Sequence, residues 1–156
     1  MVGMKIRRAR RAHPHHFFSR EEKKRIVEAI AAAEAETSGE IRVHVESTCG
    51  GDPLARAQKV FTALGMDRTA ARNGVLIYLA VRDRRFAIIG DEGIDRVVPP
   101  DFWRETKDVM EGYFREGRFL EGILHGIASA GEHLAAYFPH RKDDVDELPD
   151  ELSEGE

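Results

Sequence analysis

The sequence of 156 residues is poor in cysteine and has no long apolar segment. Its one cysteine, Cys49, excludes an internal disulfide and a zinc cluster built on cysteines. No stretch approaches the ~20 apolar residues that a membrane-spanning helix needs. The N-terminus is basic, but the apolar segment of a secretory signal does not follow it. We therefore expect a cytoplasmic protein without an integral membrane segment.

The sequence also lacks the short motifs that are typical of common catalytic sites. It contains no G-x-S-x-G nucleophile elbow, no Walker A motif, no H-E-x-x-H and no G-x-G-x-x-G. The glycine-rich stretch 50–52 is similar to a phosphate-binding loop, but it lacks the lysine and the spacing of one. A function must therefore be sought in residues that the fold brings together.

Charge is distributed unevenly along the chain. Residues 1–18 carry five basic residues and no acid, whereas residues 139–156 carry two basic and eight acidic residues. We predict a flexible basic leader (1–18), a folded domain (19–139) and a mobile acidic tail (140–156). The domain between the two ends is acidic, so we expect no nucleic-acid partner.

Two apolar runs at residues 75–81 and 86–89 predict the centre of the fold. Both runs are rich in Val and Ile, and a polar link at 82–85 joins them, which is typical of two strands. The first run is nearly continuous, so we expect a strand that is covered on both faces. Residues 40–46 alternate between apolar and polar, which predicts a further strand with one more polar face.

Helical signals fill most of the remaining chain. Ser19 and Glu22 form a capping box that opens a helix ending near residues 38–39. Apolar residues at helical spacing predict further helices at 53–64, after the cap at 99–101, and from residue 119 to 137, with a short helical turn at 93–98. The order strand, helix, strand favours a parallel crossover, and the link at 82–85 makes the third strand antiparallel.

This α/β topology predicts that the starts of the first two strands and the end of the third lie at one end of the sheet. Carboxylate and amide oxygens are the ligands of hard cations, so we expect Ca²⁺ or Mg²⁺ there. The candidate metal ligands are Glu40, Asn73, Asp91 and Asp95.

The same end of the sheet also offers candidate catalytic residues, namely Arg72 and Asp91. An arginine beside a bound cation stabilises the charge of a phosphoryl group. The alternative is structural, in which Asn73-Gly74 and Gly90 shape turns and Arg72 pairs with Asp91 where a strand ends.

The opposite end of the sheet gathers a reserve metal site of Glu46, Asp52 and Asp83. His44 lies two residues before Glu46 on the same strand, and the two side chains are either ligands, an acid–base pair, or members of satisfied cross-strand pairs. The residues alone leave these alternatives open.

Several segments together resemble the TPM domain family. They are Thr37-Ser38-Gly39-Glu40-Ile41, Arg72-Asn73-Gly74-Val75-Leu76-Ile77, Asp83-Arg84-Arg85-Phe86 and Gly90-Asp91-Glu92-Gly93-Ile94. The resemblance covers roughly residues 19–139 and implies a three-layer α/β/α sandwich around a small mixed β-sheet. It further implies binding of a divalent cation, notably calcium, and the weak acid-phosphatase-like activity of some members.

Two hypotheses about function follow. The first is a TPM domain that binds a divalent cation in an acidic cleft and hydrolyses phosphomonoesters slowly. The second is a non-enzymatic accessory module that binds a protein partner through its surface or its charged ends. The oligomeric state cannot be read from the sequence.

Overall fold

A computed structural model describes residues 13–140 and 152–155 of the chain. One mixed sheet of four strands has the order β3-β2-β1-β4. The strands are β1 (Glu40–Glu46), β2 (Gly74–Ala80), β3 (Arg85–Gly90) and β4 (Leu152–Glu154). The helices are α1 (Pro14–Phe17), α2 (Arg20–Glu34), α3 (Pro53–Ala63), α4 (Glu92–Asp95), α5 (Arg104–Arg115) and α6 (Phe119–Tyr137), with a 3₁₀ turn η2 (Met66–Arg68).

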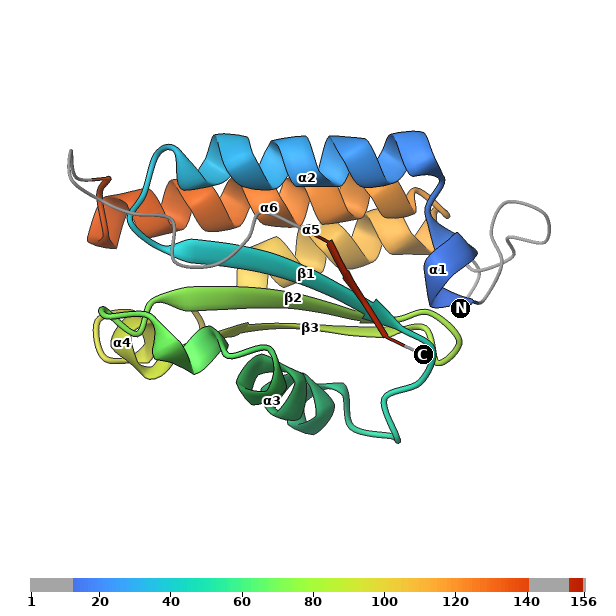
Figure 1. Cartoon of the computed structure of the whole chain (residues 1–156), viewed down its shortest axis with the longest axis horizontal. Coiled ribbons are helices and arrows are strands. Elements are labelled where there is room, and N and C mark those ends of the chain that lie inside the picture. Colours follow the sequence, from blue (N-terminus) through green and yellow to red (C-terminus); the bar gives the residue numbers. More distant parts are fainter. Residues whose placement is uncertain (1–12, 141–151, 156) are drawn as a thin grey trace.

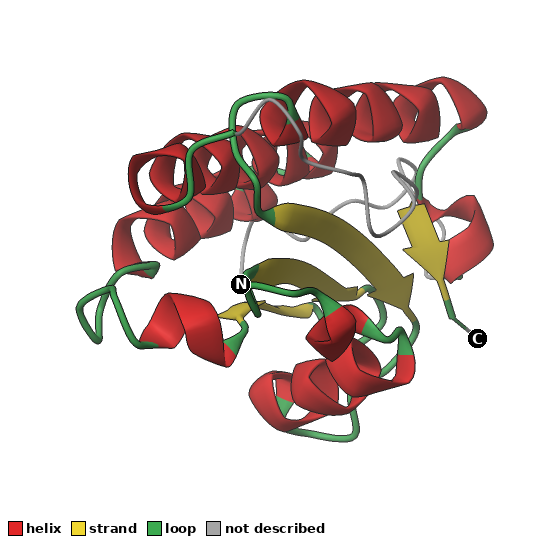
Figure 2. Ribbon diagram, turned by 60° about the vertical axis from the view of Figure 1, so that its left-hand side comes forward, coloured by secondary structure: helices red, strands yellow, loops and turns green. Residues whose placement is uncertain are grey.

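Helices cover both faces of the sheet. Helices α2, α5 and α6 lie on one face, and α3 lies on the other, as Figures 1 and 2 show. This arrangement confirms the predicted α/β fold with a helix–sheet–helix layering. Among the described residues, no helix is long and apolar enough to cross a membrane.

The strand pairing confirms the predicted topology. β1 and β2 are parallel, with Glu40 opposite Gly74, and α3 lies in the connection between them. β2 and β3 are antiparallel, with Val75 opposite Gly90. The starts of β1 and β2 and the end of β3 therefore meet at one end of the sheet, where α4 also lies (Figure 1).

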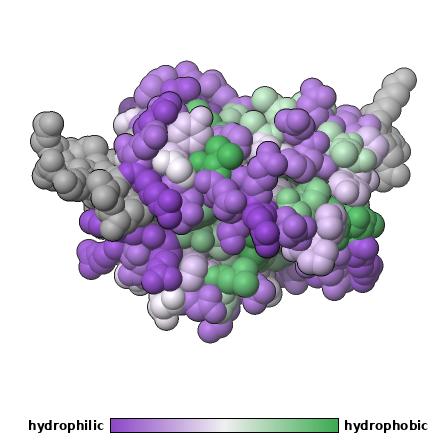
Figure 3. All heavy atoms as spheres, turned by 180° about the vertical axis from the view of Figure 1, so that it is seen from behind, coloured by the Kyte–Doolittle hydropathy of each residue, from purple (hydrophilic) through white to green (hydrophobic). Residues whose placement is uncertain are grey.

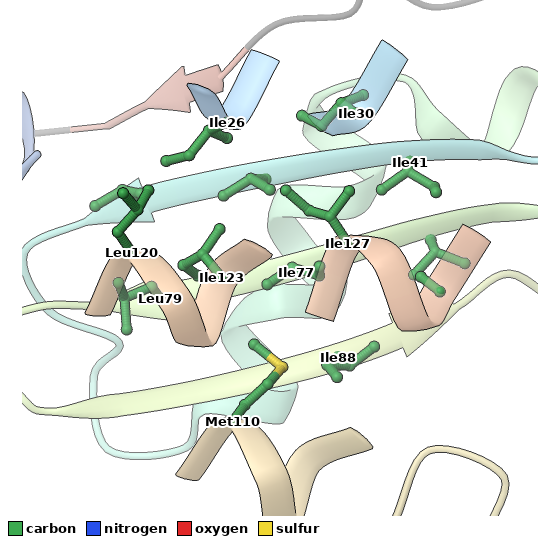
Figure 4. Close-up of a cluster of buried hydrophobic side chains, with 14 of the residues drawn as sticks. Ile26, Ile30, Ile41, Ile77, Leu79, Ile88, Met110, Leu120, Ile123 and Ile127 are labelled. Carbon is green, nitrogen blue, oxygen red and sulfur yellow. The ribbon is translucent and has the colours of Figure 1, made fainter. Parts of the chain in front are cut away.

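The main core fills the space between the sheet and the three-helix layer (Figure 4). Ile26 and Ile30 of α2 and Ile123 and Ile127 of α6 are fully buried there, because their spacing places them on one face of each helix. A smaller core around Tyr78 lies beneath α3. β2 is buried along its whole length between the two cores, as its continuous apolar run predicts.

The face of the molecule seen in Figure 3 is mainly hydrophilic. Figure 3 shows one face on which hydrophobic residues form separate patches among polar ones. The large hydrophobic side chains that stand out by exposure belong to different elements: Leu54, Val97, Val109 and Tyr137. Such scattered exposure is ordinary for a folded domain.

Residues 13–18 and 152–155 are packed against the domain, where the sequence predicts a flexible leader and a mobile tail. Phe17 and Phe18 are 5% and 2% exposed, because α1 carries them into the main core. Near the other end, β4 pairs with β1. The rest of the predicted leader (1–12) and most of the tail (141–151, 156) lie outside the described residues.

Two local predictions also need correction. Helix α5 begins at Arg104 instead of directly after Asp101, because separate turns occupy the intervening residues: the amide of Phe102 donates to Pro99 and that of Arg104 to Asp101. Strand β1 has alternating polar residues as predicted, yet the strand is buried along its whole length. Its polar side chains therefore need internal partners.

Candidate functional site

The sheet has two polar ends, which are compared below. The Arg72 end comprises Glu40, Arg72, Asn73, Asp91, Glu92 and Asp95, at the start of β1 and β2 and the end of β3. The Glu46 end comprises His44, Glu46, Asp52, Arg56, Tyr78 and Asp83, at the opposite end of the same strands.

An ion pair between Arg72 and Asp91 organises the Arg72 end. Arg72 donates from Nε to Oδ2 of Asp91 at 2.7 Å and from Nη2 to Oδ1 at 2.9 Å. Its Nη1 donates to Oε1 of Glu92 at 3.2 Å. The hydrogen bonds with Asp91 raise the pKa of Arg72 above its ordinary value. The structural alternative from the sequence, a pair of Arg72 with Asp91, is therefore present.

The backbone around Arg72 is strained. Arg72 has φ of 52°, a left-handed conformation that is unfavourable for a residue with a Cβ. Its carbonyl accepts a hydrogen bond from the amide of Gly93 at 2.9 Å. A Cβ added to Gly93 would lie 2.2 Å from the carbonyl oxygen of Ala71, so only glycine fits there. The loop before β2 and helix α4 are thus packed backbone against backbone.

Asp91 connects the loop before β2, which contains Arg72, to the sheet and to α4. Its side chain is 6% exposed, its amide donates to the carbonyl of Gly74, and its Oδ1 accepts from the amide of Glu92 at the start of α4. Because both of its oxygens already accept hydrogen bonds, Asp91 is held in one orientation.

Further carboxylates lie within electrostatic reach of this pair. Burial and the charge of Asp91 both raise the pKa of Asp95. Asp67 and Glu92 act on Arg72, and Glu92 also pairs with Arg96 at 3.1 Å. The side chains of Arg72 and Glu92 are 37% and 52% exposed, so this charged group meets solvent.

The remaining candidate ligands lie deeper. Glu40 and Asn73 are 4% and 2% exposed, and the amide of Glu40 donates to the carbonyl of Asn73 at 3.4 Å. Nδ2 of Asn73 donates to Oγ of Ser38 at 3.4 Å, which turns the amide oxygen of Asn73 the other way. Within residues 13–140 and 152–155, no three His, Cys, Asp or Glu side chains are grouped as a metal centre.

At the opposite end of the sheet, Glu46 is the centre of a buried network. It accepts from Nε and Nη2 of Arg56 at 2.7 and 3.0 Å, from the hydroxyl of Tyr78, and lies 3.2 Å from Nε2 of His44. Burial alone would raise the pKa of Glu46, but the hydrogen bonds outweigh it and lower the pKa to about 2. Burial lowers the pKa of His44, and burial together with Glu46 raises that of Tyr78.

Asp52 and Asp83, the other two residues of the reserve metal site, each make hydrogen bonds to a different part of the backbone. Asp52 caps α3 by accepting from the amides of Leu54 and Ala55. Asp83 accepts from the amide and the thiol of Cys49, and the hydrogen bond from that amide lowers the pKa of Asp83. A pocket of about 660 Å³ is lined by Glu46 and Asp52 but not by Asp83.

Sequence reasoning missed Arg56 and Tyr78 as partners of Glu46. Tyr78 interrupts an otherwise apolar strand with one hydroxyl, and a buried hydroxyl needs an acceptor, so this signal was available. Arg56 lies between two alanines on α3, and nothing in this local pattern points to Glu46. His44 and Glu46 do form a satisfied pair, but along one strand instead of across two.

The fold and the two polar ends define an α/β/α domain, and comparison with known proteins gives its family. A model of the TPM domain matches residues 13–133, so the chain belongs to the TPM domain family. No match was found among curated proteins.

Solved structures agree with this assignment. The chain is 52% identical to the BA42 protein from the psychrophilic bacterium Bizionia argentinensis, with a TM-score of 0.84, covering 89% of this chain and 96% of that one. The N-terminal domain of the cg2496 protein from Corynebacterium glutamicum is 18% identical, with a TM-score of 0.61, covering 83% and 80%. The N-terminal domain of a protein from P. gingivalis is 21% identical, with a TM-score of 0.63, covering 80% and 82%. The last two show a shared fold.

Proposed function

We propose that this TPM domain binds a divalent cation, Ca²⁺ or Mg²⁺, at the Arg72 end of the sheet. The observation that carries the proposal is the gathering of carboxylates around Arg72. Asp67, Asp91 and Glu92 all act on this one guanidinium, and Asp91 also acts on Asp95. A cation in this field would relieve the repulsion between the carboxylates.

The donor atoms fit a hard cation that keeps much of its water. Asp91, Asp95 and Asn73 offer carboxylate and amide oxygens, which Ca²⁺ and Mg²⁺ prefer, and Glu40 would serve as an inner carboxylate. Mg²⁺ in particular is commonly held by one or two carboxylates with several waters. In the described residues, Arg72 occupies both oxygens of Asp91. The guanidinium and the cation would therefore compete for the same carboxylate.

Thermal unfolding of the cation-free full-length protein tests this proposal. Added Ca²⁺ or Mg²⁺ should raise the Tm saturably, because a ligand that binds only the folded state stabilises it. Asp91→Asn should abolish the rise. Asp108→Asn, which changes an exposed carboxylate on α5, should retain it. An equal rise in Asp91→Asn and the unchanged protein would reject this site.

A slow phosphatase activity is the further chemical consequence that we propose. Arg72 would hold the phosphate of a monoester and the cation would polarise it. Because all three nitrogens of Arg72 already donate, the phosphate would displace Glu92, its more exposed partner. Cation-dependent release of phosphate from p-nitrophenyl phosphate should disappear in Arg72→Gln. An unchanged rate in that variant would exclude this role of Arg72.

A non-enzymatic interaction module is the second candidate function. The observation that favours it is β4, a short strand from the chain end that pairs with the outer side of β1. This side of β1 accepts a strand in a defined register, which is a common mode of peptide binding. In either case we propose the cytoplasm as the place of action, since the one buried, free cysteine fits a reducing compartment.

A further inference from the structure

A very short strand, β4, pairs with the outer side of β1. β4 pairs with β1 at three positions, Val43 with Leu152, His44 with Ser153, and Val45 with Glu154. The amide of Gly155 adds a hydrogen bond to the carbonyl of Val45 at 2.8 Å. By contrast, β1 pairs with β2 at seven positions. The contacts of β4 are therefore few, and all of its residues stay partly exposed.

The start of β1 is protected from strand pairing in a different way. The amide of Ile41 donates to Oε2 of Glu34 at 2.7 Å, so a side chain of α2 occupies this donor. Alternate residues of a strand direct their amides to the same side, so Val43 and Val45 face β4 as Ile41 faces Glu34. Without β4, these two residues would present an open strand edge, which is a template for strand addition.

Side chains around β1 distinguish the residues of β4. Nδ1 of His44 lies 3.0 Å from Oγ of Ser153. Glu154 pairs with Lys23 at 2.8 Å and with His15 at 3.5 Å.

Gly155 adds a third element of recognition. A Cβ added to it would lie 3.1 Å from Nε2 of His44 and 3.2 Å from Oε1 of Glu46. The outer side of β1 therefore fits a small hydroxyl residue, then an acidic residue, then glycine.

We propose that the outer side of β1 is a docking site for an extended acidic peptide of a partner protein. The chain's own residues Leu152–Gly155 occupy this site in the structure, and the strand of the partner displaces them. The ammonium group of Lys23 selects an acidic partner, and the three-residue pairing of β4 leaves it replaceable. This inference deepens the interaction candidate and is independent of the cation site.

Because β4 occupies the site, a partner peptide must compete with it in order to bind. A tethered segment competes at an effective concentration on the order of millimolar, so a peptide in trans gains access when the tethered strand is weakened. Gly155→Val places a branched side chain against His44 and Glu46 and should release the strand. Gly112→Val is the matched control, because a Cβ at Gly112 meets no atom within 4 Å.

The experiment uses full-length protein and a fluorescent peptide with the sequence of residues 150–156. Fluorescence anisotropy should show binding to Gly155→Val about tenfold tighter than to the unchanged protein or to Gly112→Val. Ser153→Pro is a second releasing variant, because proline cannot donate a backbone hydrogen bond to β1. Backbone amide shifts on peptide addition should centre on Val43 and Val45.

A charge exchange tests the recognition directly. The same peptide carrying Glu154→Lys should bind the Gly155→Val protein about fivefold more weakly, and adding Lys23→Glu to the protein should reverse this preference. Equal binding of both peptides, shifts centred elsewhere, or no saturable binding to either releasing variant would overturn the proposal. If the unchanged protein forms concentration-dependent dimers by exchanging β4, the occupant of this site is a second copy of the chain. That result would overturn the proposal of a partner protein. A partner captured through another surface would overturn only this docking site and leave the interaction candidate standing.

Discussion

The two ends of the sheet carry their charges in opposite ways. At the Glu46 end, one carboxylate with a side chain 5% exposed is hydrogen-bonded to three different side chains. At the Arg72 end, several carboxylates surround one arginine that is 37% exposed and strained at φ of 52°. A buried polar group is tolerated when it is fully satisfied, and it then fixes the local structure. The Glu46 end therefore stabilises the fold, whereas we propose that the Arg72 end exchanges its partners with a ligand.

The largest effect should come from removing the centre of the buried network. Glu46→Ala leaves the hydroxyl of Tyr78 and the ring of His44 without their shared acceptor, and should lower the free energy of unfolding by about 3 kcal/mol. Glu92→Ala at the opposite end should cost less than about 1 kcal/mol, because Glu92 is exposed. Urea unfolding measures both. Equal losses would remove the distinction between the two ends.

Acid should weaken the Glu46 end in a defined pH range. The folded state holds the pKa of Glu46 at about 2, below its ordinary value of 4.5. The unfolded chain therefore binds more protons in this range, and stability falls as the pH drops from 4.5 toward 2, by about 2–3 kcal/mol. The lowered pKa of His44 has the same sign and starts to act below pH 6.5. Glu46→Gln should flatten the acidic part of a stability–pH curve, and an unchanged curve would exclude Glu46 as its source.

The backbone contact at the Arg72 end gives the next effect. Gly93→Ala should cost about 2 kcal/mol, because the new Cβ would overlap the carbonyls of Ala71 and Arg72. The same substitution at Gly112, where the Cβ meets nothing within 4 Å, should be neutral or stabilising. Thermal or urea unfolding compares the pair. Two equal effects would show that the loop before β2 relaxes away from α4.

The smallest effect on stability should come from Arg72 itself. Arg72→Gln removes an ion pair whose guanidinium is partly exposed, so we expect the smallest change in the free energy of unfolding among these variants. The same variant should bind Ca²⁺ more tightly, because the guanidinium no longer competes for Asp91. Calorimetric titration measures this affinity. A loss of affinity in Arg72→Gln would mean that Arg72 positions Asp91 for the cation instead of competing with it.

The sequence predicts the sheet well because its signals are local and repeated. The continuous run 75–81 and the short link 82–85 determine the central strand and its antiparallel neighbour, and these place Arg72 beside Asp91. The partnership of Glu46 with Arg56 could not be predicted in this way, because the two residues meet only after α3 packs on the sheet. Strand β4 could not be predicted either, because three residues in an acidic tail are too few to show the alternation of apolar and polar residues that is typical of a strand.

The central claim is that the Arg72 end, and not the Glu46 end, exchanges its partners with a cation. Titration of Ca²⁺ into cation-free, full-length protein, followed by backbone amide shifts, tests it most directly. The account predicts saturable shifts centred on residues 72–74 and 90–95, with residues 44–52 unaffected. Shifts centred on residues 44–52 and Asp83, or no saturable shift below millimolar cation, would contradict it.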